Sequence, residues 1–258
     1  MFPLPIDIGG LQLHLSLLIF MTLGIIIGTI VGSREYQRLG FNNHDRNQLY
    51  WALAIPIAFL ISMFTAYLLN LEGWNLFENL ENAFSFGFSS FGVILGILFL
   101  GYIQSKIYKE PSAGKRLDFI SSILPLSMGI YRIGCLLNGC CFGNVTNSPF
   151  GVYLPDAYGV WAYRYPTQIL LILFDFGLFF WLWQCRGKQS FDGKLSLTFL
   201  ILFSLGRFLI DGLRDLPAAL GPLSPLQLVS FCIFAITLYI AYEFRNENKF
   251  KRAENNNA

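Results

Sequence analysis

Two arginines lie inside long apolar stretches of this sequence, where a charged side chain is unexpected. Arg132 lies in ISSILPLSMGIYRIGCLLNG, residues 120–139, and Arg207 in LSLTFLILFSLGRFLIDGLRD, residues 195–215. A charge within a membrane span is costly, so it usually faces the interior of a helix bundle and has a function there. Two such guanidinium groups can hold an anion, and the anion that a bilayer supplies is a phospholipid headgroup.

Further charged residues follow Arg207 at helical spacing. Asp211 comes four residues later and Arg214 three residues after that, so all three lie on one helix face. A structural interpretation stays open, in which Arg207 and Asp211 form an i,i+4 ion pair and Arg132 extends its head group to the membrane surface. Asp175, in the stretch between the two arginine segments, is interpreted as a group that forms hydrogen bonds between helices.

The composition predicts a polytopic membrane protein. Hydrophobic residues make up 54% of the 258 residues and charged residues 13%, and the mean hydropathy is +0.52. These values exclude an ordinary soluble domain of this size. A spanning helix needs about 20 mostly apolar residues, and the candidate stretches are 11–32, 50–69, 84–105, 118–138, 168–184, 195–213 and 225–243. We therefore predict an all-α bundle of about seven transmembrane helices, with residues 1–258 as a single integral-membrane domain.

Lys and Arg are distributed unevenly between the connecting segments. Of the 18 basic residues, 14 fall in segments 33–49, 106–117, 185–194 and 244–258, on one face of the alternating topology. The positive-inside rule makes this face cytoplasmic, with the N-terminus outside and the C-terminus inside. Arg132 and Arg207 then lie roughly 20 Å from the cytoplasmic ends of their helices, in the outer half of a bilayer core about 30 Å thick. The net charge of only +2 gives no basic surface for nucleic acid.

Three of the five cysteines, Cys135, Cys140 and Cys141, cluster at the outer end of the fourth predicted span. An outer location permits disulfides, and Asn138-Gly139 predicts a helix break that would make a bridge geometrically possible. The C-x4-C-C spacing lacks a second ligand pair and a nearby His, which disfavours zinc, so no metal is expected. Two further interpretations stay open: small buried hydrophobic side chains, or a reactive thiol activated by a neighbouring cation such as that of Arg132.

Four short motifs together resemble one protein family. The run YRIGCLLNGCCFG, residues 131–143, resembles the signature of bacterial prolipoprotein diacylglyceryl transferases, roughly G-R-x-G-N-x-x-N-G-E-x-x-G. YPTQ at 165–168 resembles that family's His-Pro-Thr-Gln, and GRFLIDGLR at 206–214 its R-F-x-x-E-x-x-R segment. Ser224 and Gln227 match a Ser-x-x-Gln element. The order of the motifs and the predicted topology also match, so the resemblance covers nearly the whole chain.

The resemblance implies a multi-pass enzyme of the bacterial inner membrane that needs no cofactor. Such enzymes move the diacylglyceryl group of phosphatidylglycerol onto the thiol of a lipobox cysteine in a prolipoprotein, and glycerol phosphate leaves. Arg132 and Arg207, with Asp211 beside them, would stabilise the negative charge on the departing phosphate. The positions expected to bind substrate are Asn138, Gly139, Gly143, Gln168, Arg214, Ser90 and Gln227.

Several family positions carry other residues here. The Asn and Glu of the family signature are Cys135 and Cys140, which makes these two thiols candidates for a reactive role. The His of a His-Gly-Gly element, proposed to help deprotonate the acceptor thiol, is replaced by Ser90, and the His before Pro-Thr-Gln by Tyr165. Among the family's motif residues, those expected to bind the phosphate are retained, whereas those expected to handle the proton of the thiol are altered. Asp211, at the position of the family's Glu, or a cysteine could replace the base, although a carboxylate paired to an arginine is a poor base.

Two other classes of function stay open from the sequence. The first is a diverged member of this family that binds phospholipid without transferring it. The second is a small-solute transporter, but transporters tend to contain internal repeats and polar residues near the membrane midplane. The sequence has no convincing repeat, and its polar residues crowd the outer half.

Overall fold

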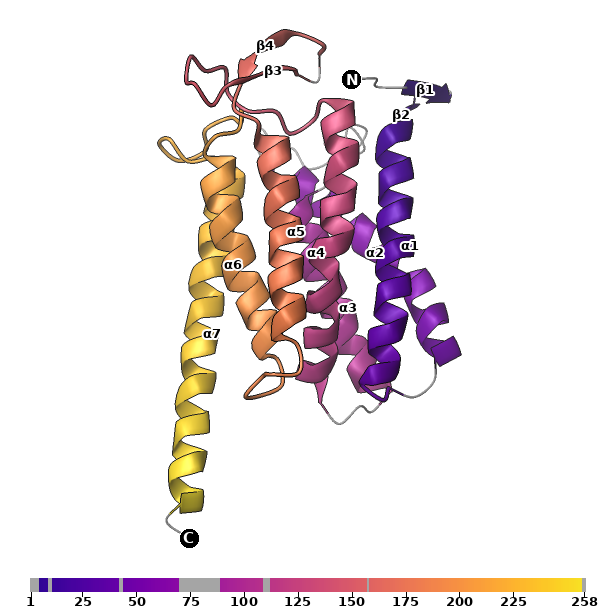
Figure 1. Ribbon diagram of the computed structural model, residues 1–258, viewed down its shortest axis with the longest axis vertical. Helices are drawn as coiled ribbons and strands as arrows, with labels where there is room; N and C mark the ends of the chain where they lie inside the picture. The colour runs from indigo at the N-terminus through magenta and orange to yellow at the C-terminus, as the bar shows by residue number, and fades with distance from the viewer. Residues whose placement is uncertain are drawn as a thin grey trace.

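A computed structural model of the chain describes residues 5–8, 11–41, 44–69, 89–108, 112–156 and 158–256. The helices of this part are α1 Leu15–Arg38, α2 His44–Leu69, α3 Ser90–Ile107, α4 Ala113–Asn138, α5 Thr167–Cys185, α6 Lys194–Asp211 and α7 Pro225–Asn256. Two antiparallel hairpins, β1 Pro5–Ile8 with β2 Leu11–His14 and β3 Val152–Pro155 with β4 Trp161–Arg164, lie at one end of the helix bundle, which we call the hairpin end (Figure 1). The last turns of α7 project beyond the opposite end.

The prediction of a polytopic helical membrane protein is confirmed. Within the described residues, six helices are long and apolar enough to cross a membrane, namely α1, α2, α3, α4, α5 and α7. Helix α6 has a similar length but carries Lys194, Arg207 and Asp211. It packs against α4, α5 and α7 within the bundle. Arg207 and Asp211 are therefore buried by neighbouring helices, whereas Lys194, at the start of α6, is exposed.

The helix bounds differ from the predicted spans in several places: α1 ends at Arg38, α2 begins at His44 and α4 begins at Ala113, each five or six residues outside its predicted span. Residues 11–14, predicted to begin the first span, form strand β2, because they pair with β1. The third helix begins at Ser90, and residues 84–88 of the predicted span lie outside the described residues. Helix α7 continues to Asn256 instead of ending near residue 243, since the charged residues of its last turns are good helix formers that can extend into water.

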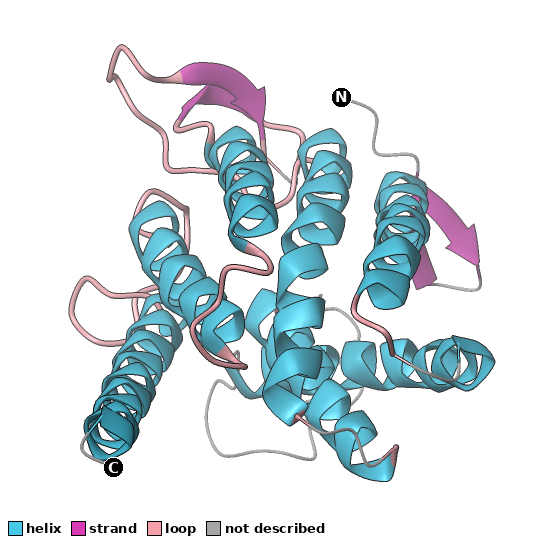
Figure 2. Ribbon diagram, turned by 60° about the horizontal axis from the view of Figure 1, so that its bottom comes forward, coloured by secondary structure: helices cyan, strands magenta, loops and turns pink. Residues whose placement is uncertain are grey.

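Helix α4 is the centre of the bundle and packs against α1, α3, α5 and α6 (Figure 2). Small residues allow the helices to approach closely: a Cβ added at Gly24 of α1 would lie 2.8 Å from the carbonyl oxygen of Ser127 in α4. The Ser127 hydroxyl donates a hydrogen bond to the Gly24 carbonyl at 2.9 Å. The interior is aromatic and aliphatic, with Phe91, Phe199 and Phe203 buried between α3 and α6.

At the end opposite the hairpins, Asp118 fixes α4 to the start of α6. One carboxylate oxygen accepts a hydrogen bond from the Gly193 amide at 2.8 Å, and the other accepts one from the Ser196 amide at 2.8 Å. The first amides of a helix have no partner within the helix, so a carboxylate from a neighbouring helix acts as the cap. The contact fixes where α6 begins relative to α4, at the end of the helix opposite Arg207.

Candidate active site

Two buried arginines from different helices meet near the hairpin end. Nε of Arg132, on α4, lies 3.7 Å from Oδ2 of Asp175 on α5. Nη2 of Arg207, on α6, lies 3.0 Å from Oδ2 of Asp211. Arg207 is within electrostatic range of both Arg132 and Arg214. The structure thus brings together the arginines that the sequence singled out, and we call Arg132, Arg207 and Arg214 the arginine cluster.

Asp211 lies between two members of the arginine cluster. Besides its contact with Arg207, its Oδ1 accepts a hydrogen bond from Nη1 of Arg214 at 3.1 Å. The three residues therefore share one side of α6 and its C-terminal extension, as their spacing predicts. Arg214 lies beyond the end of α6; burial opposes its charged form, but the nearby Cys141 and Asp211 raise its pKa above the ordinary value. Asp211 therefore positions both arginines.

The arginine cluster has more hydrogen-bond donors than the protein uses. Within the arginine cluster, four buried guanidinium nitrogens make no hydrogen bond to the described residues: Nε of Arg132, Nε and Nη1 of Arg207, and Nε of Arg214. Buried polar groups are normally hydrogen-bonded. The Arg207–Asp211 ion pair that the sequence left open as purely structural does exist, but it occupies only part of the Arg207 guanidinium. The remaining donors suit an anion with several oxygen atoms, such as a phosphate.

An apolar cavity of about 640 Å³ extends from Arg132 and Cys141 into the bundle. Its walls are α1, α2, α3 and α4, and Ser90, a predicted substrate-binding residue, lines it at the start of α3. Along α4 the lining runs from Phe119 to Arg132, a distance of roughly 20 Å at the helical rise per residue. A long apolar cavity with a cation at one end is suited to an amphiphile whose headgroup is anionic.

The loop after α4 is shaped by two residues in left-handed conformations. Gly139 ends the helix with a φ of 75°, and Cys141 has a φ of 61°. Side chains of α5 then hold the loop: Gln168 donates to the Cys140 carbonyl at 3.1 Å, and Thr167 donates to the Cys141 carbonyl at 2.8 Å. Gly139 and Gln168, predicted to bind substrate, thus build the loop. Their direct contact with substrate stays a prediction.

Predicted site residues also supply acceptor atoms near this loop. Oδ1 of Asn138, the last residue of α4, and Oε1 of Gln168 are buried and accept no hydrogen bond from the described residues. Both can therefore accept a hydrogen bond from a hydroxyl group of a ligand.

Gly143 joins the loop to the segment that follows α6. It forms an antiparallel bridge with Arg214, and the Asn144 amide donates to the Leu213 carbonyl at 2.9 Å. A Cβ at position 143 would lie 2.3 Å from the Tyr165 carbonyl oxygen. Only glycine fits here, because three backbone segments approach one another closely; contact of Gly143 with substrate stays a prediction.

Arg164 belongs to the same region and was not selected as a site residue from the sequence. It is buried, donates to the Gly143 carbonyl at 3.3 Å and pairs with Asp156 at 2.8 Å. The signal for it was present in the charge distribution, because Arg164 is one of the four basic residues outside the segments assigned to the cytoplasm.

Gln227, predicted to bind substrate, uses its polar groups within the protein. Its Oε1 accepts from the Ser224 amide at 3.0 Å, and its own amide donates to the Ser224 hydroxyl at 3.3 Å. This reciprocal pair is a capping box at the start of α7. Nε2 of Gln227 donates to the Phe208 carbonyl at 3.3 Å, which ties α7 to α6.

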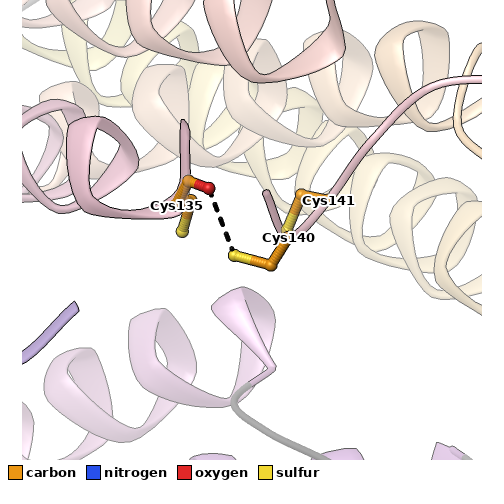
Figure 3. A group of neighbouring side chains, drawn as sticks. All are labelled: Cys135, Cys140 and Cys141. Carbon is orange, nitrogen blue, oxygen red and sulfur yellow. Dashed lines mark hydrogen bonds between the residues drawn. The ribbon is translucent and has the colours of Figure 1, made fainter. Parts of the chain in front are cut away.

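The three clustered cysteines converge. The Sγ atoms of Cys135, Cys140 and Cys141 all lie within 4.8 Å of one another, and we call them the thiol cluster. Figure 3 shows the Cys140 thiol turned toward the Cys135 carbonyl, to which it donates at 3.5 Å. Nη1 of Arg132 donates to the Cys141 sulfur at 3.9 Å, so the neighbouring cation that a reactive thiol requires is present. All five cysteines lie in the described residues and form no disulfide in this structure.

Comparisons with known proteins agree with this geometry. A family model described as "Prolipoprotein diacylglyceryl transferase" matches residues 3–242. A phosphatidylglycerol–prolipoprotein diacylglyceryl transferase of Clostridioides difficile strain 630 is 30% identical over 236 residues, which cover 89% of this chain and 91% of that protein. A second such transferase, from Clostridium perfringens, is 30% identical over 257 residues, covering 95% and 94%. One from Campylobacter jejuni subsp. doylei is 29% identical over 254 residues, covering 94% and 82%. The chain belongs to the prolipoprotein diacylglyceryl transferase family.

Proposed function

We propose that this protein transfers the diacylglyceryl group of phosphatidylglycerol to the thiol of a lipobox cysteine in a prolipoprotein, at the outer face of the bacterial inner membrane. The observation that carries the proposal is the set of buried guanidinium donors without hydrogen-bond partners near the end of an apolar cavity. The names of the related transferases support the choice of substrates. The bias of Lys and Arg along the sequence supports the outer position of the arginine cluster.

In this proposal the lipid lies along the cavity. Its acyl chains occupy the apolar space between α1, α2, α3 and α4, and its phosphate lies against Arg132 and Arg207. Both arginines are held by carboxylates, Asp175 and Asp211, before the lipid arrives. Fixed cations need little reorganisation when charge develops, and this makes them effective in a site of low dielectric constant.

The transfer itself is a substitution at carbon. The acceptor thiol loses its proton to water, its sulfur attacks the glyceryl carbon that carries the phosphate, the carbon–oxygen bond breaks, and its electron pair leaves with glycerol phosphate. The arginine cluster stabilises the negative charge that grows on the leaving oxygen. Asp211 is a positioning residue in this account, because both of its oxygens face arginines.

The test is a lipidation assay with the full-length protein in phosphatidylglycerol liposomes. A lipobox peptide is added and its mass is followed; we expect a gain of one diacylglyceryl group on the cysteine. Arg132→Ala and Arg207→Ala should each lower the transfer rate by about 100-fold or more, enough to remove the detectable gain, while the protein remains folded and inserted. Arg186→Ala is the matched control, because this arginine follows α5 at the opposite end of the bundle, over the Trp183 ring.

A negative result would be interpretable with an active relative assayed in parallel. If the relative modifies the peptide and this protein does not, the transferase proposal is wrong. Retention of phosphatidylglycerol by the wild type but not by the two arginine variants would then favour the phospholipid-binding alternative.

A further inference from the structure

The fold holds the three sulfur atoms of the thiol cluster in positions that their spacing in the sequence does not specify. Cys135 lies in the last turns of α4, and the left-handed conformations of Gly139 and Cys141 fold the following loop back toward it. A non-glycine residue adopts this conformation at an energetic cost and keeps it mainly where the surrounding structure or function requires it. Hydrogen bonds from Thr167 and Gln168 hold the two carbonyls of the loop. The positions of the sulfur atoms are thus set by the fold.

The number of converging thiols indicates which chemical role they have: nucleophile or base, disulfide, or metal ligand. A nucleophile or a base requires one sulfur, and a disulfide requires two. Three sulfur atoms within 4.8 Å of one another match the ligand set of a soft metal ion. In a tetrahedral zinc–thiolate site the Zn–S distance of about 2.3 Å places the sulfur atoms roughly 3.8 Å apart, a contraction that side-chain rotation can supply. A three-ligand site needs neither the second ligand pair nor the nearby His whose absence from the sequence disfavours zinc.

The surroundings balance the charge of such a site. Three thiolates around one divalent ion carry an excess negative charge, which is costly in a buried position. Arg132 contacts the Cys141 sulfur, and Arg214 is within electrostatic range of it. Cys141 also lines the cavity in which the lipid is proposed to lie. A metal ion on these sulfurs would therefore be adjacent to the space where the acceptor thiol must react.

We propose that Cys135, Cys140 and Cys141 bind one Zn²⁺ whose fourth coordination position, facing the cavity, takes the thiol of the acceptor cysteine. Catalytic zinc sites commonly use three protein ligands and keep one open position. This inference rests on the proposed function for its choice of acceptor. The metal site itself depends only on the three sulfurs.

The reaction balances without an oxidant or reductant. On binding zinc, the acceptor thiol loses its proton to water, because a coordinated thiol is deprotonated. The zinc-bound sulfur attacks the glyceryl carbon, and the electron pair of the breaking carbon–oxygen bond leaves with glycerol phosphate. The product is a neutral thioether, a weaker zinc ligand than a thiolate, so it dissociates. Zinc thus replaces the histidine that the family resemblance implies as the base, whose position is here occupied by Ser90.

Metal binding can be measured independently of activity. The full-length protein is purified in detergent under reducing conditions, freed of metal and titrated with Zn²⁺, and with Co²⁺ as a spectroscopic probe. We expect one ion per chain, with sulfur-to-cobalt charge-transfer absorption. Cys135→Ser, Cys140→Ser and Cys141→Ser should each weaken binding by roughly tenfold or more, since each removes one of three ligands. Cys185→Ser and Cys232→Ser, outside the thiol cluster, are the matched controls and should leave binding unchanged.

The outcomes separate this inference from the proposed function. Zinc binding that survives the three cluster variants, or a disulfide within the cluster in the freshly purified protein, would overturn the metal site. Transfer at an undiminished rate in chelator-treated protein would overturn the use of zinc in catalysis while the proposed function stands. Stoichiometric zinc binding without any lipidation would support the metal site and refute the transferase.

Discussion

Nε of Arg132 lies 3.7 Å from Oδ2 of Asp175, so α4 and α5 are joined by a buried ion pair beside the proposed phosphate site. Neither oxygen of Asp175 accepts a hydrogen bond from the described residues. The carboxylate is therefore held by charge alone, mainly that of Arg132 and Arg207. A phosphate that binds the arginine cluster would compete with Asp175 for the same cations.

Removing the carboxylate should destabilise the protein without lipid. Asp175→Ala leaves Arg132 buried without its partner, and breaking a buried pair in this way costs about 3 kcal/mol. Asp175→Asn keeps the shape and one acceptor, so it should cost less. Added phosphatidylglycerol should restore part of the loss, because its phosphate replaces the missing negative charge. Thermal unfolding in detergent, with and without the lipid, measures both effects; equal stability of Asp175→Ala and wild type would contradict this role.

Arg207 should be needed for its forked geometry as well as its charge. Arg207→Ala removes two unpartnered donors and should lower the transfer rate by about 100-fold, as loss of a transition-state donor does elsewhere. Arg207→Lys keeps the charge but cannot offer two parallel donors, so we expect an intermediate rate. Initial rates in liposomes measure this order, with circular dichroism as the check of folding. A Lys variant as fast as wild type would contradict the need for the forked geometry, and equal rates for the Lys and Ala variants would contradict the contribution of the charge.

Gly143→Ala should disrupt the loop that carries the thiol cluster. The added Cβ would meet the Tyr165 carbonyl at 2.3 Å, so the bridge to Arg214 must shift. We expect reduced thermal stability and loss of transfer. Gly177→Ala is the matched control, because nothing lies within 4 Å of a Cβ at that helical position; it should be neutral or stabilising by up to about 1 kcal/mol. If both variants behave alike, the close approach at Gly143 is not required.

The charged part of the site could be predicted from the sequence because charge stands out against an apolar background. Arg132, Arg207 and Asp211 are conspicuous inside spans, and helical spacing alone places Asp211 near Arg207 and Arg214. The partner of Arg132 could not be predicted in this way. Asp175 lies on another helix, and its pairing depends on how α5 packs against α4, which periodicity does not specify.

Backbone conformation explains the rest of what the sequence left open. The Asn138-Gly139 pair predicted a helix break, but the convergence of three thiols also requires the left-handed conformation of Cys141, which no residue pattern indicates. Gln227 matched a family element, yet its side chain completes a capping box with Ser224. Residues 11–14 read as the start of an apolar span, although they pair with β1.

Asp118 gives a prediction about folding that is independent of the site chemistry. Its two oxygens accept the amides of Gly193 and Ser196 at the start of α6, whereas Arg207 lies near the other end of that helix. Asp118→Ala removes both hydrogen bonds and should cost about 2 kcal/mol, a fall of about 5 °C in the midpoint of thermal unfolding. Asp118→Asn retains one acceptor, so its stability should lie between those of the wild type and Asp118→Ala.

The transfer rate separates this role of Asp118 from a catalytic one. Per folded molecule, Asp118→Ala should lipidate the peptide at the wild-type rate below its unfolding transition, because the cap sets where α6 begins and the remaining contacts of α6 with α4, α5 and α7 still position Arg207. If Asp118→Ala has the stability of the wild type, whether or not its transfer rate is reduced, Asp118 does not act through the helix cap.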